Sequence, residues 1–199
     1  TYLFSGNSFL EFNGGYAFSN LDRFDPYLQD RFLEYGDGMA NEEVGFDWPY
    51  NPETGANRYS LPTDLTLFNF VFKPYGAAVA GYQKFNRQNY NFNLAYTSQI
   101  NKEHNLKIGA EYQYYDIANY SFGNERLLTL PSKINDDANT SDPLGAATII
   151  RREGVNMFGY NEFGEKTNDG LEEWDQSRNP TFLGVYAQDR IEYNDLIIN

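Results

Sequence analysis

Cysteine is absent from this chain of 199 residues, and histidine occurs only once. The chain can therefore form neither a disulfide framework nor a thiolate metal site. Basic residues are also scarce, because 15 Lys and Arg stand against 28 Asp and Glu and leave a formal net charge of −13. Such an acidic chain is a poor partner for nucleic acid. No run of eighteen apolar residues occurs, so the sequence contains no candidate transmembrane helix.

Aromatic residues, by contrast, make up 18% of the chain, and many of them follow a period of two between residues 90 and 122. Even positions in this stretch are mostly apolar or aromatic, whereas odd positions are mostly Asn, Gln, Thr, Lys and Glu. The alternation continues in the same phase on both sides of the polar segment 101–105. A period of two indicates a strand with two unlike faces. The pattern therefore predicts a long antiparallel hairpin with all its apolar side chains on one face.

We expect Ile100 to pair with Leu106 in this hairpin, which would place Leu94 opposite Tyr112. The first strand covers at least residues 90–100, close to the roughly 9–11 residues that a tilted strand needs to cross a bilayer. Ordinary strands have about 5–6 residues. Tyrosines gather toward the ends of the apolar stripe, as in an aromatic girdle. The same alternation would suit a soluble sheet with its apolar face in a core.

Two further stretches alternate in the same way, residues 8–18 and 181–193, and residues 1–5 resemble the end of a strand. The turns next to these strands are short and lie at Gly6-Asn7, residues 101–105 and Asn194-Asp195. Two segments without alternation, each of about sixty residues, lie between the strands. Compact soluble domains rarely contain structureless loops longer than about 12–15 residues, whereas outer-membrane barrels alternate short periplasmic turns with long extracellular loops.

The sequence thus predicts an all-β fold. We expect a partial antiparallel transmembrane β-barrel of about five or six strands with two long irregular extracellular loops. Residues 20–79 and 124–180 would lie outside the cell, and the short turns would face the periplasm. Within the first loop we expect a short helix after Asp25-Pro26 and a short strand within residues 65–72. We take the chain to be a piece of a longer protein.

Two stretches also resemble a known family. Residues 97–112, TSQINKEHNLKIGAEY, resemble a barrel hairpin of TonB-dependent outer-membrane receptors. Residues 186–193, YAQDRIEY, continue into LIIN at 196–199 and resemble another such hairpin. The resemblance is nearest to the large receptors that carry a carboxypeptidase-regulatory-like domain ahead of plug and barrel.

This resemblance implies that residues 1–199 are a fragment of a receptor barrel domain in the outer membrane of a Gram-negative cell. Such receptors take up scarce, bulky nutrients of the siderophore, oligosaccharide or peptide class, using energy relayed by TonB. The implied partners are outer-membrane lipid, the nutrient, and the receptor's own plug domain and TonB. The plug and the TonB box are not among these 199 residues, which would supply only wall and loops.

Two other functions fit the pattern. One is a passive porin or structural outer-membrane barrel, and the other is a secreted all-β carbohydrate-binding domain. No G-x-S-x-G, phosphate-loop or H-E-x-x-H motif occurs. We therefore predict neither an enzyme nor a cofactor.

The candidate sites are few. His104 is expected to be a residue of the hairpin turn. Carboxylates at Asp136-Asp137, Asp142 and residues 169–173 could hold calcium, but their spacing does not fit the twelve-residue calcium loop. We expect a solvated acidic loop and no metal site.

Loop aromatics are the candidate ligand-binding residues, because an exposed ring can stack on a sugar or a chelate ligand. Their alternative role is to pack the two loops onto one another. These residues are Trp48, Tyr50, Phe158, Tyr160 and Trp174.

Overall fold

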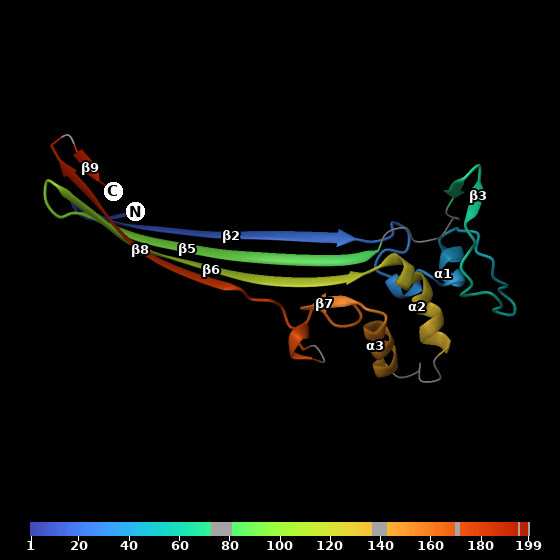
Figure 1. Ribbon diagram of the computed structural model, residues 1–199. Helices are drawn as coiled ribbons and strands as arrows, with labels where there is room; N and C mark the ends of the chain where they lie inside the picture. Colours follow the sequence, from blue (N-terminus) through green and yellow to red (C-terminus); the bar gives the residue numbers. More distant parts are fainter. Residues whose placement is uncertain (73–80, 137–142, 170–171, 195, 199) are drawn as a thin grey trace. The chain divides into compact units, whose positions relative to one another are not determined.

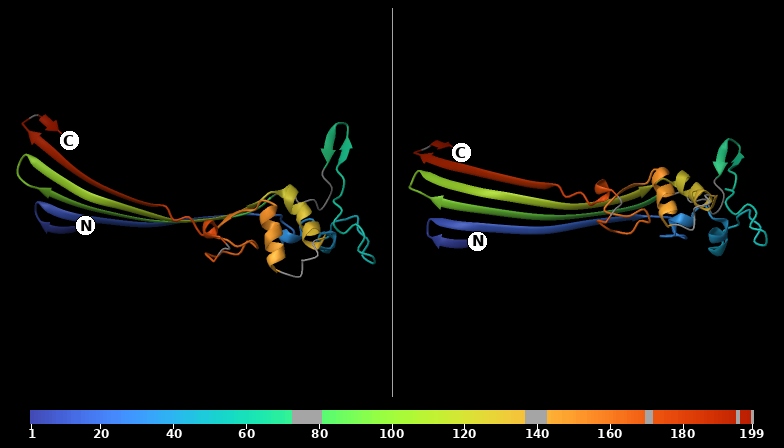
Figure 2. Two further views of the ribbon diagram at one scale, coloured as in Figure 1. Left: turned by 60° about the horizontal axis from the view of Figure 1, so that its bottom comes forward. Right: turned by 90° about the horizontal axis from the view of Figure 1, so that it is seen from below.

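The computed structural model describes residues 1–72, 81–136, 143–169, 172–194 and 196–198 (Figure 1). Most of the regular structure is one antiparallel sheet, in which the long strands lie side by side (Figure 2). Its strands are β1 (Tyr2–Ser5), β2 (Ser8–Arg23), β5 (Tyr82–Gln99), β6 (His104–Phe122), β7 (Asn156–Phe158), β8 (Thr181–Tyr193) and β9 (Leu196–Ile198).

The strand order is β1-β2-β5-β6-β8-β9, and β7 pairs with β6. The predicted mostly-β antiparallel architecture is confirmed, with seven strands in the sheet instead of five or six. Strands β2, β5 and β6 contain 16, 18 and 19 residues, far above the usual 5–6 or so. Within the described residues the sheet is open, because β1 and β9 at its two ends do not pair. Barrel closure therefore stays a prediction.

The chain divides into two compact units. Unit 1 contains residues 1–19, 86–117 and 178–199, and unit 2 contains residues 20–85 and 118–177. Strands β2, β5 and β6 contribute residues to both units.

In unit 1, strands β6 and β8 pair without interruption from His104 opposite Ile191 to Tyr114 opposite Thr181. This register sets even positions of β6 against odd positions of β8. Side chains of directly paired residues lie on the same face of a sheet. Ile108 and Ala187, for example, point to one side of the sheet.

The β5–β6 hairpin has a shorter turn than predicted. The Ile100 amide donates to the His104 carbonyl at 3.0 Å, so Ile100 does not pair with Leu106. The Asn101 side chain closes the turn by accepting from the amides of Glu103 and His104 at 2.8 and 2.9 Å, a local bond that Asn favours. The register is therefore shifted by two residues. A shift of two keeps every side chain on its predicted face.

Unit 2 corrects the prediction of two long irregular loops, because both loops fold. The first loop contains η1 (Phe32–Glu34), α1 (Gly38–Glu43), β3 (Leu65–Leu67) and β4 (Phe70–Phe72). The second contains α2 (Asn124–Asp136), α3 (Pro143–Arg152), β7 and η2 (Glu173–Asp175). No helix within the described residues is long and apolar enough to cross a membrane.

A shared hydrophobic core explains why the loops fold. Leu28 and Phe32 come from the first loop, Leu130 and Ile150 from the second, and all are buried together with Tyr120 of β6. Tertiary packing supplies most of the stability of short helices. The two loops thus form a single structural unit.

The predicted short helix after Asp25-Pro26 begins later than expected, as the 3₁₀ helix η1, and residues 26–30 form a turn. The Asp25 carboxylate accepts from the amides of Tyr27 and Leu28 at 2.9 and 3.0 Å. Gln29 then adopts φ 45°, which prevents a helix from continuing. The predicted strand within residues 65–72 is instead a hairpin of two strands, β3 and β4.

Candidate functional site

The first candidate site is one face of unit 1, here named the apolar face. Its residues are Leu10, Phe12, Tyr16, Phe18, Tyr90, Phe92, Leu94, Tyr96, Leu106, Ile108, Ala110, Tyr112, Tyr114, Leu183, Val185, Ala187, Ile191 and Tyr193. Ring contacts connect neighbouring strands on this face, with centroids 4.9 Å apart for Tyr16 and Tyr90 and 6.2 Å apart for Tyr90 and Tyr114. Leu183 and Val185 remain 73% and 79% exposed. A continuous exposed apolar surface of this kind is typical of a site of contact with another protein or a membrane.

The opposite face of unit 1, the polar face, is covered only in part, because Asn13, Glu111, Gln188 and Arg190 are exposed. It carries Glu11, Asn13, Asn91, Asn93, Thr97, Gln99, Asn105, Lys107, Glu111, Gln113, Gln188 and Arg190. Ala95 and Thr97 on this side are only 2% and 9% exposed, whereas Leu94 on the apolar face is 45% exposed. A sheet folded for water would have its apolar side chains covered.

His104 lies at the start of β6 and not in the turn. Its Nδ1 is 2.7 Å from Oδ2 of Asp189 on β8, so the structure supplies the carboxylate partner that the sequence did not place. Asp189 interrupts the apolar alternation of its strand, and pairing lowers the cost of a carboxylate on that face. The break in the pattern at Asp189 was the one sequence signal for this contact.

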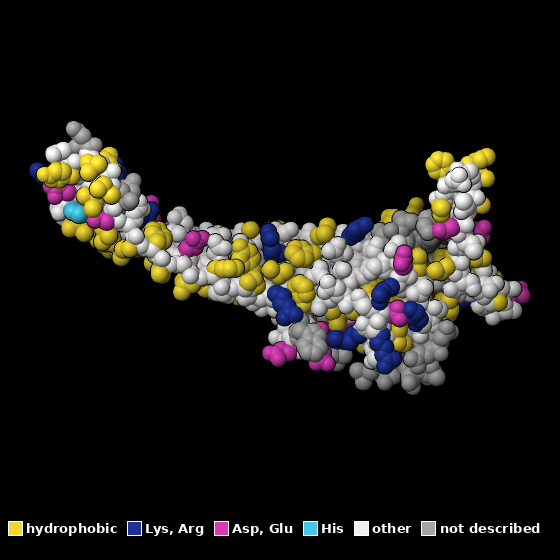
Figure 3. Space-filling model, in the orientation of Figure 1, with side chains coloured by type: hydrophobic (Ala, Val, Ile, Leu, Met, Phe, Trp, Pro, Cys, Tyr) yellow, Lys and Arg dark blue, Asp and Glu magenta, His cyan; other side chains and the backbone are white. Residues whose placement is uncertain are grey.

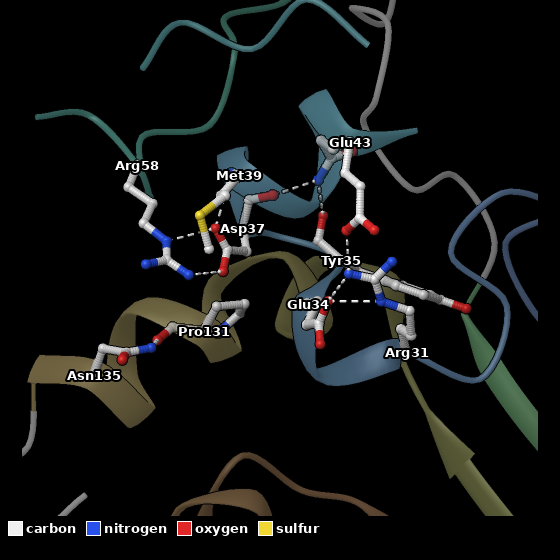
Figure 4. Close-up of polar contacts among 10 residues, drawn as sticks. Arg31, Glu34, Tyr35, Asp37, Met39, Glu43, Arg58, Pro131 and Asn135 are labelled. Atoms are coloured by element: carbon white, nitrogen blue, oxygen red, sulfur yellow. Dashed lines mark hydrogen bonds and ion pairs between the residues drawn. The ribbon is translucent and has the colours of Figure 1, made fainter. Parts of the chain in front are cut away.

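The second candidate site is a polar cavity of about 330 Å³ in unit 2 (Figure 4). Asp37 caps α1 by accepting from the Met39 amide at 3.0 Å, and it also receives Nε and Nη2 of Arg58 at 2.7 and 2.5 Å. These bonds raise the pKa of the Arg58 guanidinium. A two-point pair of this kind fixes geometry as well as charge.

Arg31 forms the other charged group of the cavity. Its guanidinium contacts Glu34 at 2.5 Å and Glu43 at 2.8 Å. The charges around the cavity are therefore matched to one another, and the cavity offers hydrogen-bonding groups without a strong excess charge. It suits binding of a polar molecule better than acid–base chemistry.

A buried ion triad holds the second loop in place. Arg151 in the last turn of α3 donates Nε to Glu162 at 2.6 Å and Nη2 to Asp175 in η2. Glu162 and Asp175 are only 5% and 2% exposed. Arg151 thus joins α3 to two segments that follow it in the chain.

The loop aromatics predicted to bind ligand differ in how far their rings are exposed. Trp48 and Tyr160 are 2% and 7% exposed, so their rings pack within unit 2 and offer no face to a ligand. Tyr50 and Phe158 are half-buried, and their binding role stays a prediction. Trp174 lies in η2, but its side chain lies outside the described residues.

Only some of the acidic residues considered as calcium ligands lie within the described residues. Asp137, Asp142 and the side chain of Asp136 lie outside the described residues. Within the described part of the chain, no group of three His, Cys, Asp or Glu residues is suited to hold a metal ion. Glu172 has a local role, because it caps η2 in a capping box with Asp175.

Three buried tyrosines make unit 2 sensitive to alkaline pH. Burial raises the pKa of Tyr35 to about 12, and burial also raises the pKa of Tyr82 and Tyr120. The Tyr82 hydroxyl donates to Asp30 at 2.7 Å, which further favours its neutral form. These protons are held more tightly in the folded state than in the unfolded chain, where the pKa is about 10.

We therefore expect unit 2 to lose stability as the pH rises above about 10, with full stability below that pH. Each tyrosine contributes up to about 1.4 kcal/mol per pH unit in this range. Tyrosinate absorbance and circular dichroism should change together in an alkaline titration of the full-length protein, and Tyr35→Phe should make the loss shallower. Ionisation of all tyrosines near pH 10 without loss of structure would contradict this expectation.

Comparison of the chain with protein-family models, with curated proteins and with solved structures gives no match. The functional argument therefore depends on the apolar face, the folded loops and the chemistry of their residues.

Proposed function

We propose that this chain forms part of the wall and the external loops of a TonB-dependent outer-membrane receptor. The observation that carries the proposal is the continuous apolar face of unit 1, on which Leu94, Leu183 and Val185 are 45%, 73% and 79% exposed. Lipid is the solvent in which such a sheet is stable, with the polar face turned toward a wet interior. The open edges of the sheet would be closed by further strands, since an open sheet cannot span a bilayer.

The folded loops favour a receptor over a passive pore. A specific receptor needs a binding surface with fixed geometry, and rigid support is what a shared core provides. Unit 2 has such a core, and its cavity holds polar side chains in fixed ion pairs. The proposed nutrient is bulky and of the siderophore, oligosaccharide or peptide class. The proposed partners are outer-membrane lipid and the receptor's own plug domain and TonB.

Sidedness tests this proposal in the full-length protein. These 199 residues contain no cysteine, and any cysteine elsewhere in the full-length protein is first replaced by serine. One variant carries a single cysteine in the first loop, Glu53→Cys. A separate variant carries a single cysteine in the β5–β6 turn, Lys102→Cys. Both positions are exposed. On intact cells that carry the full-length protein, a membrane-impermeant maleimide should label the variant at 53 only. The variant at 102 should react after the outer membrane is permeabilised.

The opposite labelling order would invert the topology. Equal labelling of both variants on intact cells would indicate a protein that does not span the membrane, as expected for a secreted carbohydrate-binding domain. Labelling after denaturation shows that each cysteine is present and reactive.

A further inference from the structure

Hairpin β3–β4 exposes nearly all of its apolar side chains. The exposed fractions are 63% for Leu65, 49% for Leu67, 86% for Phe68, 69% for Phe70, 59% for Val71 and 52% for Phe72. No charged residue lies between Leu65 and Phe72. The two strands form a separate sheet that pairs with no other strand in the described part of the chain. Hydrophobic side chains gather on both sides of this hairpin in Figure 3.

The turn of the hairpin presents an aromatic ring at a conformational cost. Phe68 and Asn69 have φ of 50° and 65°, which matches the two-residue turn that suits the twist of a hairpin. Asn accepts this conformation readily, whereas a bulky residue such as Phe is an outlier there. Gly would be the unstrained choice at position 68. A strained and highly exposed Phe is more useful for contact with another molecule than for folding.

The exposed area is large enough for a protein interface. Leu65 pairs with Phe72 and Leu67 with Phe70, so these four side chains share one face of the hairpin, whereas Val71 lies on the other. With Phe68 in the turn, they leave on the order of 600 Å² exposed, since a Phe side chain can bury about 150–250 Å². The largest apolar patch on a typical monomer is about 300–600 Å². One side of a standard protein interface buries about 800 Å².

Charge decides between the possible occupants of this surface. In unit 2, Asp and Glu outnumber Lys and Arg about two to one. An anionic lipid surface or a second copy of this chain would bring negative charge toward a negative unit. A protein with basic residues around an apolar patch would be attracted to it.

We propose that hairpin β3–β4 is the docking surface for a different protein, whose contact patch has an apolar centre and a rim of Lys and Arg. Phe68 and Phe70 are the central anchors, because large aromatic residues near the middle of an interface carry most of the binding energy. This inference does not require unit 1 to lie in a membrane.

Site-specific photo-crosslinking in the cells that make the full-length protein tests this surface. The probe p-benzoylphenylalanine replaces Phe68 in one variant and Tyr27 in a matched control, since Tyr27 is aromatic, 59% exposed and also in unit 2. We expect one protein adduct from position 68 and none from position 27. The crosslinked peptide of the partner should be apolar and flanked by Lys or Arg.

Two variants of the hairpin then test the anchors. Phe70→Ser should lower the adduct yield from position 68 at least about tenfold, whereas Thr66→Ser in the neighbouring strand should leave it unchanged. Higher salt should also lower the yield, because the rim contacts are screened. Near-ultraviolet circular dichroism of each variant checks that the core tyrosines of unit 2 remain packed.

Four results would overturn the proposal. They are an adduct of two copies of this chain, an adduct with lipid, no adduct at position 68, and a protein adduct that is indifferent to Phe70→Ser.

Discussion

Leu94→Arg should reduce the amount of folded protein in the outer membrane far below the level of Asn93→Arg. The two residues are neighbours in β5, with Leu94 on the apolar face and Asn93 on the polar face. An arginine that faces lipid near the bilayer midplane costs about 2–4 kcal/mol, whereas charges on the wet side are tolerated. The SDS-resistant, heat-modifiable band in outer-membrane preparations of the full-length protein measures the folded fraction.

A soluble core would also reject Leu94→Arg, because the charge would be buried. The double variant Leu94→Phe with Tyr96→Leu separates the two cases, since it exchanges larger and smaller apolar groups on the same face. A lipid-facing surface should accept this exchange with little change. A close-packed core would lose about 1–3 kcal/mol to overpacking at position 94. If the exchange harms folding as much as Leu94→Arg does, the apolar face is a protein core.

Arg151→Met should destabilise unit 2 by about 3–5 kcal/mol, the usual cost of removing one partner from a buried ion pair. The substitution would leave Glu162 and Asp175 buried, and together they would repel each other. Hydrogen exchange of the Ile150 and Tyr120 amides in the full-length protein reports the stability of this core.

Arg152→Met is the matched control, because Arg152 is the next residue of α3 and is exposed. A surface substitution should change stability by no more than about 0.5 kcal/mol. Adding Glu162→Gln and Asp175→Asn to Arg151→Met should recover part of the loss, since the buried charges are then removed. Equal effects of Arg151→Met and Arg152→Met would show that the triad does not stabilise unit 2.

The strands could be predicted from sequence because alternation is a local property. Strand β8 begins at Thr181 and ends at Tyr193 as predicted. The β5–β6 register was missed by two residues, since the hydrophobic pattern fits both registers equally well. The Asn101 side chain favours the shorter turn.

The folding of the loops could not be predicted in the same way. Helix α2 contains Pro131, and Pro inside a helix is unfavourable locally. What stabilises this helix is contact with residues about a hundred positions away, such as Leu28 and Phe32. No spacing pattern in the two loops indicates such a core.

The contacts within the candidate sites could not be predicted either, because they join residues far apart in the sequence. His104 and Asp189 are 85 positions apart, and only the break in alternation marked Asp189. The Arg151 triad joins residues on three separate segments, none of which carries a recognisable motif. Residues 65–72 were predicted to be extended, but Phe68-Asn69 is not one of the common turn pairs such as Asn-Gly, so the hairpin was missed.

Spin labels on β5 test most directly whether the apolar face meets lipid. These 199 residues contain no cysteine. Once any cysteine elsewhere in the full-length protein is replaced by serine, single-cysteine variants at residues 91, 92, 93 and 94 each carry one label in the membrane-embedded protein. We expect the labels at 92 and 94 to be relaxed by oxygen, which dissolves in lipid, and those at 91 and 93 by a water-soluble nickel chelate. If the labels at 92 and 94 are shielded from both reagents, these side chains lie in a protein core and the membrane assignment is wrong.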